Sequence, residues 1–215
     1  MQKWWQTLVS VFFTQACGVC GAETDSGVFC PQCRASALTL TPMPGLKYLD
    51  GAVMGYKYDG VLKDLLHKLK FENESKFLQP LAEEAAFLAQ AYTPGGFNMV
   101  VSVPTDAARR KQRGFDIPES VFAGALAVKG TWRPQVLARV RATAPQYGLT
   151  PDKRRSNVRG CFKVQGNVSG AKILLVDDIL TTGATLDEAA KALKQAGAAS
   201  VYALTLCGSL ENFKD

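Results

Sequence analysis

The segment KILLVDDILTTGATLDEAAKALKQAGA, residues 172–198, joins an apolar run to a helix through two aspartates and a threonine-rich turn. Neighbouring carboxylates repel each other, so a fold that keeps Asp177 and Asp178 together does so at an electrostatic cost. The apolar run predicts a buried strand, and the spacing of apolar residues after Gly183 predicts a helix. The acidic pair is therefore expected at the end of a strand in an α/β fold.

The segments around this unit alternate between expected strands and expected helices. We expect strands within 51–59, 97–104, 135–140 and 200–207, and helices within 60–71, 77–92 and 117–128. Such alternation predicts a mostly parallel sheet flanked by helices, in which ligands bind beyond the carboxyl ends of the strands. The ends of strands 97–104 and 172–178 therefore point to one crevice. Residues 141–169 are polar and rich in arginine, with little periodicity.

The turn after the acidic pair has the composition of a phosphate-binding loop. It contains Thr181, Thr182, Gly183, Ala184 and Thr185. The first N–H groups of a helix are unpaired and favour anions, threonine hydroxyls add donors, and glycine allows close approach of the backbone. The aspartates upstream can bind vicinal hydroxyls or hold Mg²⁺ through its waters. A phosphate and a pair of hydroxyls a short distance apart describe a phosphorylated ribose.

Other interpretations of this segment explain less of it. The P-loop sequence G-x-x-x-x-G-K-[ST] and the dinucleotide-binding sequence G-x-G-x-x-G are both absent from the chain. A buried strand with a solvated acidic end and a capped helix would explain one aspartate and one threonine, but not the whole run.

Four cysteines near the amino terminus form two C-x-x-C pairs, CGVC and CPQC, separated by nine residues. The spacing of Cys17, Cys20, Cys30 and Cys33 predicts a tetrahedral structural Zn²⁺ site with no open position for catalysis. Disulfides are the alternative, and they fit poorly because nothing else marks the chain as secreted. Cys161 and Cys207 stand apart and are expected to be buried as small apolar residues.

Composition fits a globular protein that favours anionic partners. The chain has 215 residues, 47% of them hydrophobic and 20% charged, with a net charge of +6. No apolar run approaches the about 20 residues of a membrane span, so we expect no membrane insertion. Residues 1–17 resemble a lipoprotein signal, but the apolar run is short and interrupted, and we favour an amphipathic helix. The only histidine, His67, has no second candidate ligand or triad partner nearby and is given no catalytic role.

Several segments carry a resemblance to a known family. ILLVDDILTTGAT is similar to the phosphoribosyl pyrophosphate (PRPP) motif of type I phosphoribosyltransferases. YKYDGVLKDLLHKLKF, SVPTDAARRKQRGFD, RVRATAPQYGLTPDKRRSNVRGCF and the cysteine pairs together resemble the ComF family, the competence-associated phosphoribosyltransferase-like proteins. The resemblance spans nearly the entire chain. It implies a type I phosphoribosyltransferase fold over residues 46–215, preceded by a helix, the zinc knuckle and a linker over residues 1–45.

The resemblance also implies roles for particular residues. Asp177 and Asp178 would contact the ribose hydroxyls, with Arg141 as a further catalytic residue from a mobile loop that also holds Thr143 and Gln146. The PRPP-binding residues would be both aspartates together with Thr181, Thr182, Gly183, Ala184, Thr185, Ser102, Val103, Pro104, Thr105, Arg109 and Arg113. Mg²⁺ would accompany PRPP. Arginine suits this work because its planar fork can hold two phosphate oxygens at once.

Two departures from the family pattern leave the activity open. Asp116-Ile117 stands where the family commonly has Asn-Gln, and Thr181 stands where purine-salvage transferases have an aspartate base. We therefore expect a cytoplasmic, ComF-like protein that binds PRPP or a nucleotide and acts in natural competence. Its alternatives are a non-catalytic PRPP sensor and an accessory factor that binds single-stranded DNA, with a competence helicase as a family-based partner. The acceptor substrate, turnover and oligomeric state stay open.

Overall fold

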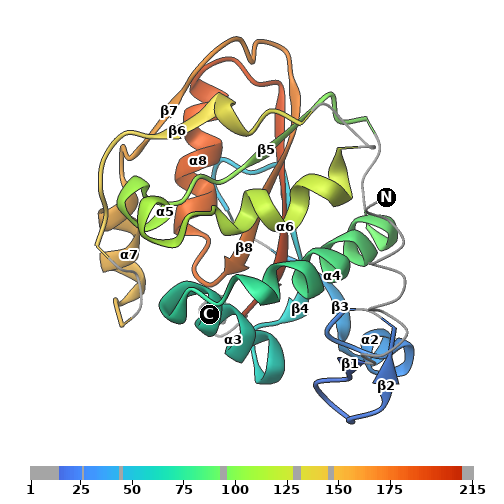
Figure 1. Cartoon of the computed structure of the whole chain (residues 1–215). Coiled ribbons are helices and arrows are strands. Elements are labelled where there is room, and N and C mark those ends of the chain that lie inside the picture. Colours follow the sequence, from blue (N-terminus) through green and yellow to red (C-terminus); the bar gives the residue numbers. More distant parts are fainter. Residues whose placement is uncertain are drawn as a thin grey trace, which may run out of the picture.

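The computed structural model describes residues 15–25, 27–43, 46–92, 96–127, 132–144 and 148–209. Its centre is a five-stranded sheet with strand order β3-β4-β9-β8-β5. The four strands from β4 to β5 are parallel, and β3 pairs with β4 in the antiparallel sense. Two smaller antiparallel pairs, β1-β2 and β6-β7, lie outside this sheet (Figure 1).

The strands and helices have the following bounds. The strands are β1 (Gln15–Ala16), β2 (Glu23–Thr24), β3 (Leu38–Pro42), β4 (Gly51–Lys57), β5 (Met99–Ser102), β6 (Leu137–Arg139), β7 (Phe162–Val164), β8 (Lys172–Leu180) and β9 (Ser200–Gly208). The α-helices are α2 (Pro31–Ala37), α3 (Gly60–His67), α4 (Leu78–Ala91), α5 (Ala107–Arg113), α6 (Ile117–Leu126), α7 (Pro151–Val158) and α8 (Ala184–Gln195). A π-helical turn, η1 (Lys68–Glu72), continues α3, and short 3-10 turns occupy Ser75–Phe77 and Pro134–Val136.

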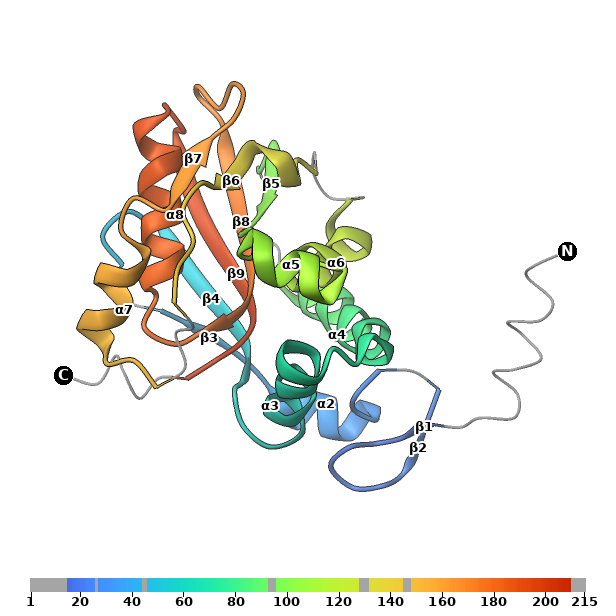
Figure 2. The ribbon, with the colours of Figure 1, turned by 60° about the vertical axis from the view of Figure 1, so that its left-hand side comes forward.

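Each face of the central sheet is covered by its own apolar core. Helix α8 and the β6-β7 pair contribute to one core, which includes Leu186, Leu193 and Phe162. Helices α3, α4 and α6 build the other, which includes Leu66 and Phe122 (Figure 2). Strand β8 runs between them, and its residues 173–178 are all buried. Strand β8 is buried on both faces because a parallel sheet of this kind needs helices on both sides.

The structure confirms the predicted α/β class, and the predicted strands and helices outside 141–169 are present with shifted ends. Two interpretations were wrong. Leu38–Pro42, taken as part of a linker, is edge strand β3, because its backbone pairs with β4. The acidic pair does not end its strand: β8 continues to Leu180, which pairs with Gly208 of β9.

Some elements of the structure were not predicted, and some predictions are not tested by the described residues. Residues 141–169 hold α7 and β7, which their weak periodicity did not indicate, and α5 was also not expected. The proposed first helix lies outside the described residues, and the division at residues 45 and 46 stays a prediction. Among the described residues, no helix is both long and apolar enough to cross a membrane.

Candidate functional site

The acidic pair lies in the carboxyl-terminal half of β8, where Asp177 is 8% and Asp178 is 7% exposed. The Asp178 backbone N–H donates to Asp177 Oδ1 over 2.9 Å. Lys70 Nζ, from the π-helical turn after α3, lies 2.9 Å from Asp178 Oδ2. Neighbouring side chains of a strand leave it on opposite faces, which separates the two carboxylates. One of them is therefore paired with a cation while the other faces the loop.

The environment of Asp177 disfavours its charge. Burial, and then the negative charge of Asp178, raise the pKa of Asp177 well above its ordinary value. Burial lowers the pKa of Lys70, but the Asp178 carboxylate outweighs that effect and the net shift is upward. A buried carboxyl group with a raised pKa in a recess is typical of functional sites.

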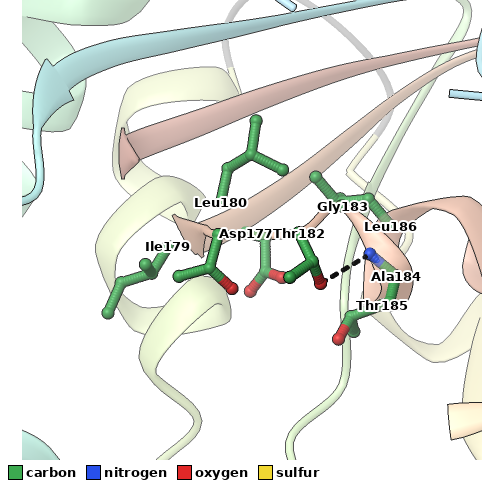
Figure 3. A pocket seen from close by; sticks show the side chains of 9 residues that line it. Asp177, Ile179, Leu180, Thr182, Gly183, Ala184, Thr185 and Leu186 are labelled. Carbon is green, nitrogen blue, oxygen red and sulfur yellow. Dashed lines mark hydrogen bonds between the residues drawn. The ribbon is translucent and has the colours of Figure 1, made fainter. Parts of the chain in front are cut away.

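The loop between β8 and α8 forms a small recess with Asp177 at its base (Figure 3). Thr181, Thr182, Gly183, Ala184 and Thr185, all predicted to bind phosphate, line it together. Figure 3 shows Asp177 beside Thr182, whose hydroxyl accepts a hydrogen bond of 3.4 Å from the Ala184 N–H. The predicted loop residues and one predicted aspartate therefore share one site.

Gly183 is required by the shape of this loop. Its φ of +71° lies in the left-handed region that glycine adopts without strain. A Cβ atom at this position would lie 2.3 Å from Leu46 Cδ2. A larger residue would be strained by the backbone conformation and would require the Leu46 side chain to shift. The loop therefore keeps the close backbone approach that a phosphate-binding turn needs.

The turn after β5 lies beside the acidic strand, because Ser102 of β5 pairs with Val176 of β8. Ser102 and Val103 are 2% and 3% exposed. The Thr105 N–H donates to Asp116 Oδ2 over 2.7 Å, and Asp116 Oδ1 caps α6 by accepting from the Glu119 N–H. Asp116, the departure from the family pattern, therefore holds the predicted pyrophosphate-facing turn against α6.

Arginines from separate elements surround this edge of the sheet. Arg109 Nη2 donates to the Thr143 carbonyl over 2.9 Å. Arg113 donates through Nε and Nη2 to the Lys70 carbonyl, over 3.2 and 3.0 Å. Arg139 donates to the Pro104 carbonyl over 3.1 Å and to Thr143 Oγ1 over 2.7 Å. Residues 102–105, α5 and the start of the 141–169 segment are thereby tied together.

Arg154 connects the 141–169 segment to the loop after β8, whereas Arg141 makes contacts within the segment. Arg154 Nη1 of α7 donates to Thr181 Oγ1 over 2.7 Å, which brings a cation to the loop between β8 and α8. Arg141, predicted to be catalytic, is exposed and donates through Nη2 to the carbonyls of Asn157 and Arg159 over 2.9 and 2.7 Å. Its contacts hold the segment to the end of α7 and not to the aspartates. Gln146 lies outside the described residues.

The structure brings three residues to the site that the sequence interpretation missed: Lys70, Arg139 and Arg154. Each is a cation, as an anionic ligand requires. The distance of each from β8 depends on the tertiary fold, so the local sequence does not show it. Two quoted segments, YKYDGVLKDLLHKLKF and RVRATAPQYGLTPDKRRSNVRGCF, contained Lys70, Arg139 and Arg154 without indicating their contacts. His67 lies apart from the acidic pair, with Nδ1 3.7 Å from Glu72 Oε1. Cys161 and Cys207 are fully buried, as predicted.

The four cysteines predicted to bind zinc converge. The sulfur atoms of Cys17, Cys20, Cys30 and Cys33 all lie within 4.8 Å of one another, and those of Cys20 and Cys30 are 3.8 Å apart. Four thiolates at about 2.3 Å from one ion would be about 3.8 Å apart, so the donor set fits Zn²⁺. Burial raises the pKa of Cys17, but backbone N–H groups of Cys20, Cys30 and Val19 bring it down to about 6. All six cysteines are free thiols, which is contrary to the disulfide alternative.

Glu84 of α4 fastens this cysteine knuckle to the main sheet. Its side chain is fully buried and pairs with Arg34 of α2 through two bonds, Nε to Oε2 over 2.8 Å and Nη2 to Oε1 over 2.9 Å. The N–H groups of Val28 and Phe29 donate to Oε1 over 2.9 and 3.2 Å, and the Tyr56 hydroxyl donates to Oε2 over 3.0 Å. One carboxylate therefore joins the knuckle, α4 and β4.

The chain is similar to several known proteins. The profile of the phosphoribosyl transferase domain matches residues 121–214. The chain is 32% identical over 210 residues to DNA utilization protein YhgH of Salmonella typhimurium, covering 90% of each chain. It is 25% identical over 195 residues to competence protein ComFC of Bacillus subtilis, covering 90% of this chain and 78% of the relative. Glutamine PRPP amidotransferase from B. subtilis superposes with a TM-score of 0.42 and 16% identity, covering 66% of this chain and 30% of that chain.

The parallel sheet, the loop after β8 and the matching profile define the chain as a protein of the type I phosphoribosyltransferase fold. Its similarity to YhgH and ComFC covers 90% of the chain in each case. The chain belongs to the ComF family.

Proposed function

We propose that this chain binds PRPP, together with Mg²⁺, in the recess between β8 and α8, and that it serves DNA utilisation or competence in the cytoplasm. The observation that carries the proposal is the placement of a buried acidic strand directly before a threonine-rich loop at the start of a helix. The acidic strand suits vicinal hydroxyls, and the threonine-rich loop at the start of the helix suits a phosphate. The names of the relatives, a DNA utilization protein and a competence protein, support the cellular role.

In this proposal different residues of the chain bind different parts of PRPP. Asp177 and Asp178 orient the ribose hydroxyls, and the loop from Thr181 to Thr185 holds the 5-phosphate. The turn 102–105, with Arg109 and Arg113 from α5, faces the diphosphate. Mg²⁺ would be held through the aspartates and would supply charge neutralisation on the diphosphate. Closure of the segment 141–169, to which Arg141 belongs, would exclude water.

The cysteine knuckle is proposed to hold one structural Zn²⁺ through Cys17, Cys20, Cys30 and Cys33. The sulfur distances and the complete set of four thiols support this assignment. A site filled by four thiolates has no open position, so its contribution is to folding and not to chemistry.

The test is a calorimetric titration of PRPP with Mg²⁺ into wild-type protein and into the Asp177→Asn/Asp178→Asn variant. We expect the wild type to bind PRPP and the variant not to bind it, because both carboxylates that would accept hydrogen bonds from the ribose hydroxyls lose their charge. Asp64→Asn on the exposed side of α3 is the matched control, and it should bind as the wild type does. Binding retained in the double variant would refute the assignment of the site. Release of pyrophosphate on addition of acceptor bases would then separate an enzyme from a PRPP sensor.

A second candidate, binding of single-stranded DNA, is favoured by the exposed basic side chains of α5 and α7. Lys111 and Arg155 are exposed on these helices, and the whole chain carries a net charge of +6. Affinity for single-stranded DNA that falls steeply with added salt would support this role. No binding at low salt would remove it. A competence helicase remains the family-based partner for either function.

A further inference from the structure

Lys70 reaches the acidic pair from the turn that follows α3. Its Nζ atom is 2.9 Å from Asp178 Oδ2, its side chain is 24% exposed, and that of Asp178 is 10% exposed. It lies in the π-helical turn Lys68–Glu72, a rare conformation that is frequent at functional sites. A lysine has a flexible stem and three donors, so its ammonium group can change partner without movement of the backbone.

Arg113 holds the backbone of Lys70 in place. Two of its guanidinium nitrogens donate to the Lys70 carbonyl, over 3.2 and 3.0 Å. This contact joins α5 to the π-helical turn and fixes the point from which the lysine side chain extends. The lysine that pairs with Asp178 is therefore anchored at its backbone by a second cation from a separate element.

The surrounding cations are oriented without being neutralised. Arg109, Arg113, Arg139 and Arg154 donate to backbone carbonyl or hydroxyl oxygens. A carbonyl oxygen orients a guanidinium group but does not cancel its charge. The nearby carboxylates Asp106 and Asp116 cap the helices α5 and α6, where the helix dipoles stabilise them. Of Lys70 and these four arginines, only Lys70 is paired with a carboxylate of the described residues.

We propose that Lys70 is a diphosphate-binding residue, which leaves Asp178 when the diphosphate of a phosphoribosyl ligand enters the site. The identity of the ligand rests on the proposed function, whereas the need for a multiply charged anion follows from the cations around the site. A diphosphate offers Lys70 more negative charge than one carboxylate does. Its departure frees Asp178 to accept hydrogen bonds from the ribose. The two halves of the ligand therefore assist each other's binding.

The experiment compares three probes in the presence of Mg²⁺: PRPP, inorganic pyrophosphate and ribose 5-phosphate. Each is titrated calorimetrically into the full chain as wild type, Lys70→Met and the control Lys63→Met, whose lysine is exposed on α3. We expect Lys70→Met to weaken PRPP and pyrophosphate by about tenfold or more, the usual effect of losing a hydrogen bond between charged groups. Affinity for ribose 5-phosphate should be unchanged or improved. An equal loss for all three probes, or no loss, would show that Lys70 is a structural counterion and would overturn the proposal.

A second pair of variants guards against failure of Lys70→Met to fold, since that change leaves Asp178 buried without its cation. Asp178→Asn removes the carboxylate partner of Lys70 and serves as the reference. Lys70→Met/Asp178→Asn, which leaves neither charge unpaired, should bind pyrophosphate about tenfold more weakly than Asp178→Asn. Equal affinity of these two variants would also overturn the proposal. Wild type that binds pyrophosphate through Lys70 but not PRPP would contradict the proposed function alone. Wild type that binds neither would contradict both.

Discussion

Replacement of Glu84 should separate the cysteine knuckle from the sheet. The carboxylate accepts two bonds from Arg34, two from the N–H groups of Val28 and Phe29, and one from Tyr56. Glu84 is fully buried and the Arg34 side chain is 14% exposed, so Glu84→Ala leaves a nearly buried cation and two backbone donors without partners. Removal of one member of a buried ion pair costs about 3–5 kcal/mol. For a chain of this length that is a fall in Tm of roughly 6–20 °C.

The assay combines urea unfolding, followed by circular dichroism, with hydrogen exchange of the peptide that contains Val28 and Phe29. Glu84→Gln keeps an oxygen for the backbone donors but loses the charge, so we expect about half the cost of Glu84→Ala. Arg34→Met should cost less in the Glu84→Gln background than in the wild type, because the cation is then already unpaired. Glu83→Ala on the same helix is the control. A cost for Glu84→Ala no greater than for Glu83→Ala, with exchange of Val28 and Phe29 unchanged, would refute this account of the anchor.

Three further predictions concern the ligand site and the knuckle. Asp177→Asn should raise the free energy of unfolding at neutral pH by about 1 kcal/mol or more, because burial and Asp178 raise the pKa of this carboxyl group. The folded state binds the proton of the Asp177 carboxyl group more tightly than the unfolded state does. The free energy of unfolding of the wild type, relative to that of Asp177→Asn, should therefore fall as pH rises through the raised pKa. A difference that stays constant in urea titrations at several pH values would contradict this. Gly183→Ala should destabilise the chain by about 1–2 kcal/mol and weaken PRPP binding, because its φ is +71° and a Cβ would meet Leu46; unchanged thermal denaturation and calorimetry would count against it. Chelation should remove one Zn²⁺ per chain and lower the Tm, and Cys33→Ser should have the same effect. The control Cys161→Ser should retain the metal in elemental analysis. A metal-free wild type would disprove the zinc assignment.

The local sequence determined the parallel strands of the central sheet and the residue types of the site. Apolar runs set the strands β4, β5, β8 and β9, since periodicity and turn residues act over short distances. The acidic pair and the threonines adjoin each other in the chain, so their shared recess followed from one strand, one loop and one helix. The two C-x-x-C pairs likewise predicted the four-cysteine cluster.

Contacts between distant segments were decided only by the tertiary structure. The alternation of leucine and threonine in Leu38–Pro42 is compatible with a strand, but the segment becomes edge strand β3 because the edge of β4 offers it backbone partners. Lys70 meets Asp178, and Glu84 meets Arg34, because the packing of α3 and α4 on the sheet sets those distances. A charged side chain has the same appearance in the sequence whether it faces solvent or a buried partner. Only the folded chain shows which charges are paired, since pairing depends on distance in space and on burial.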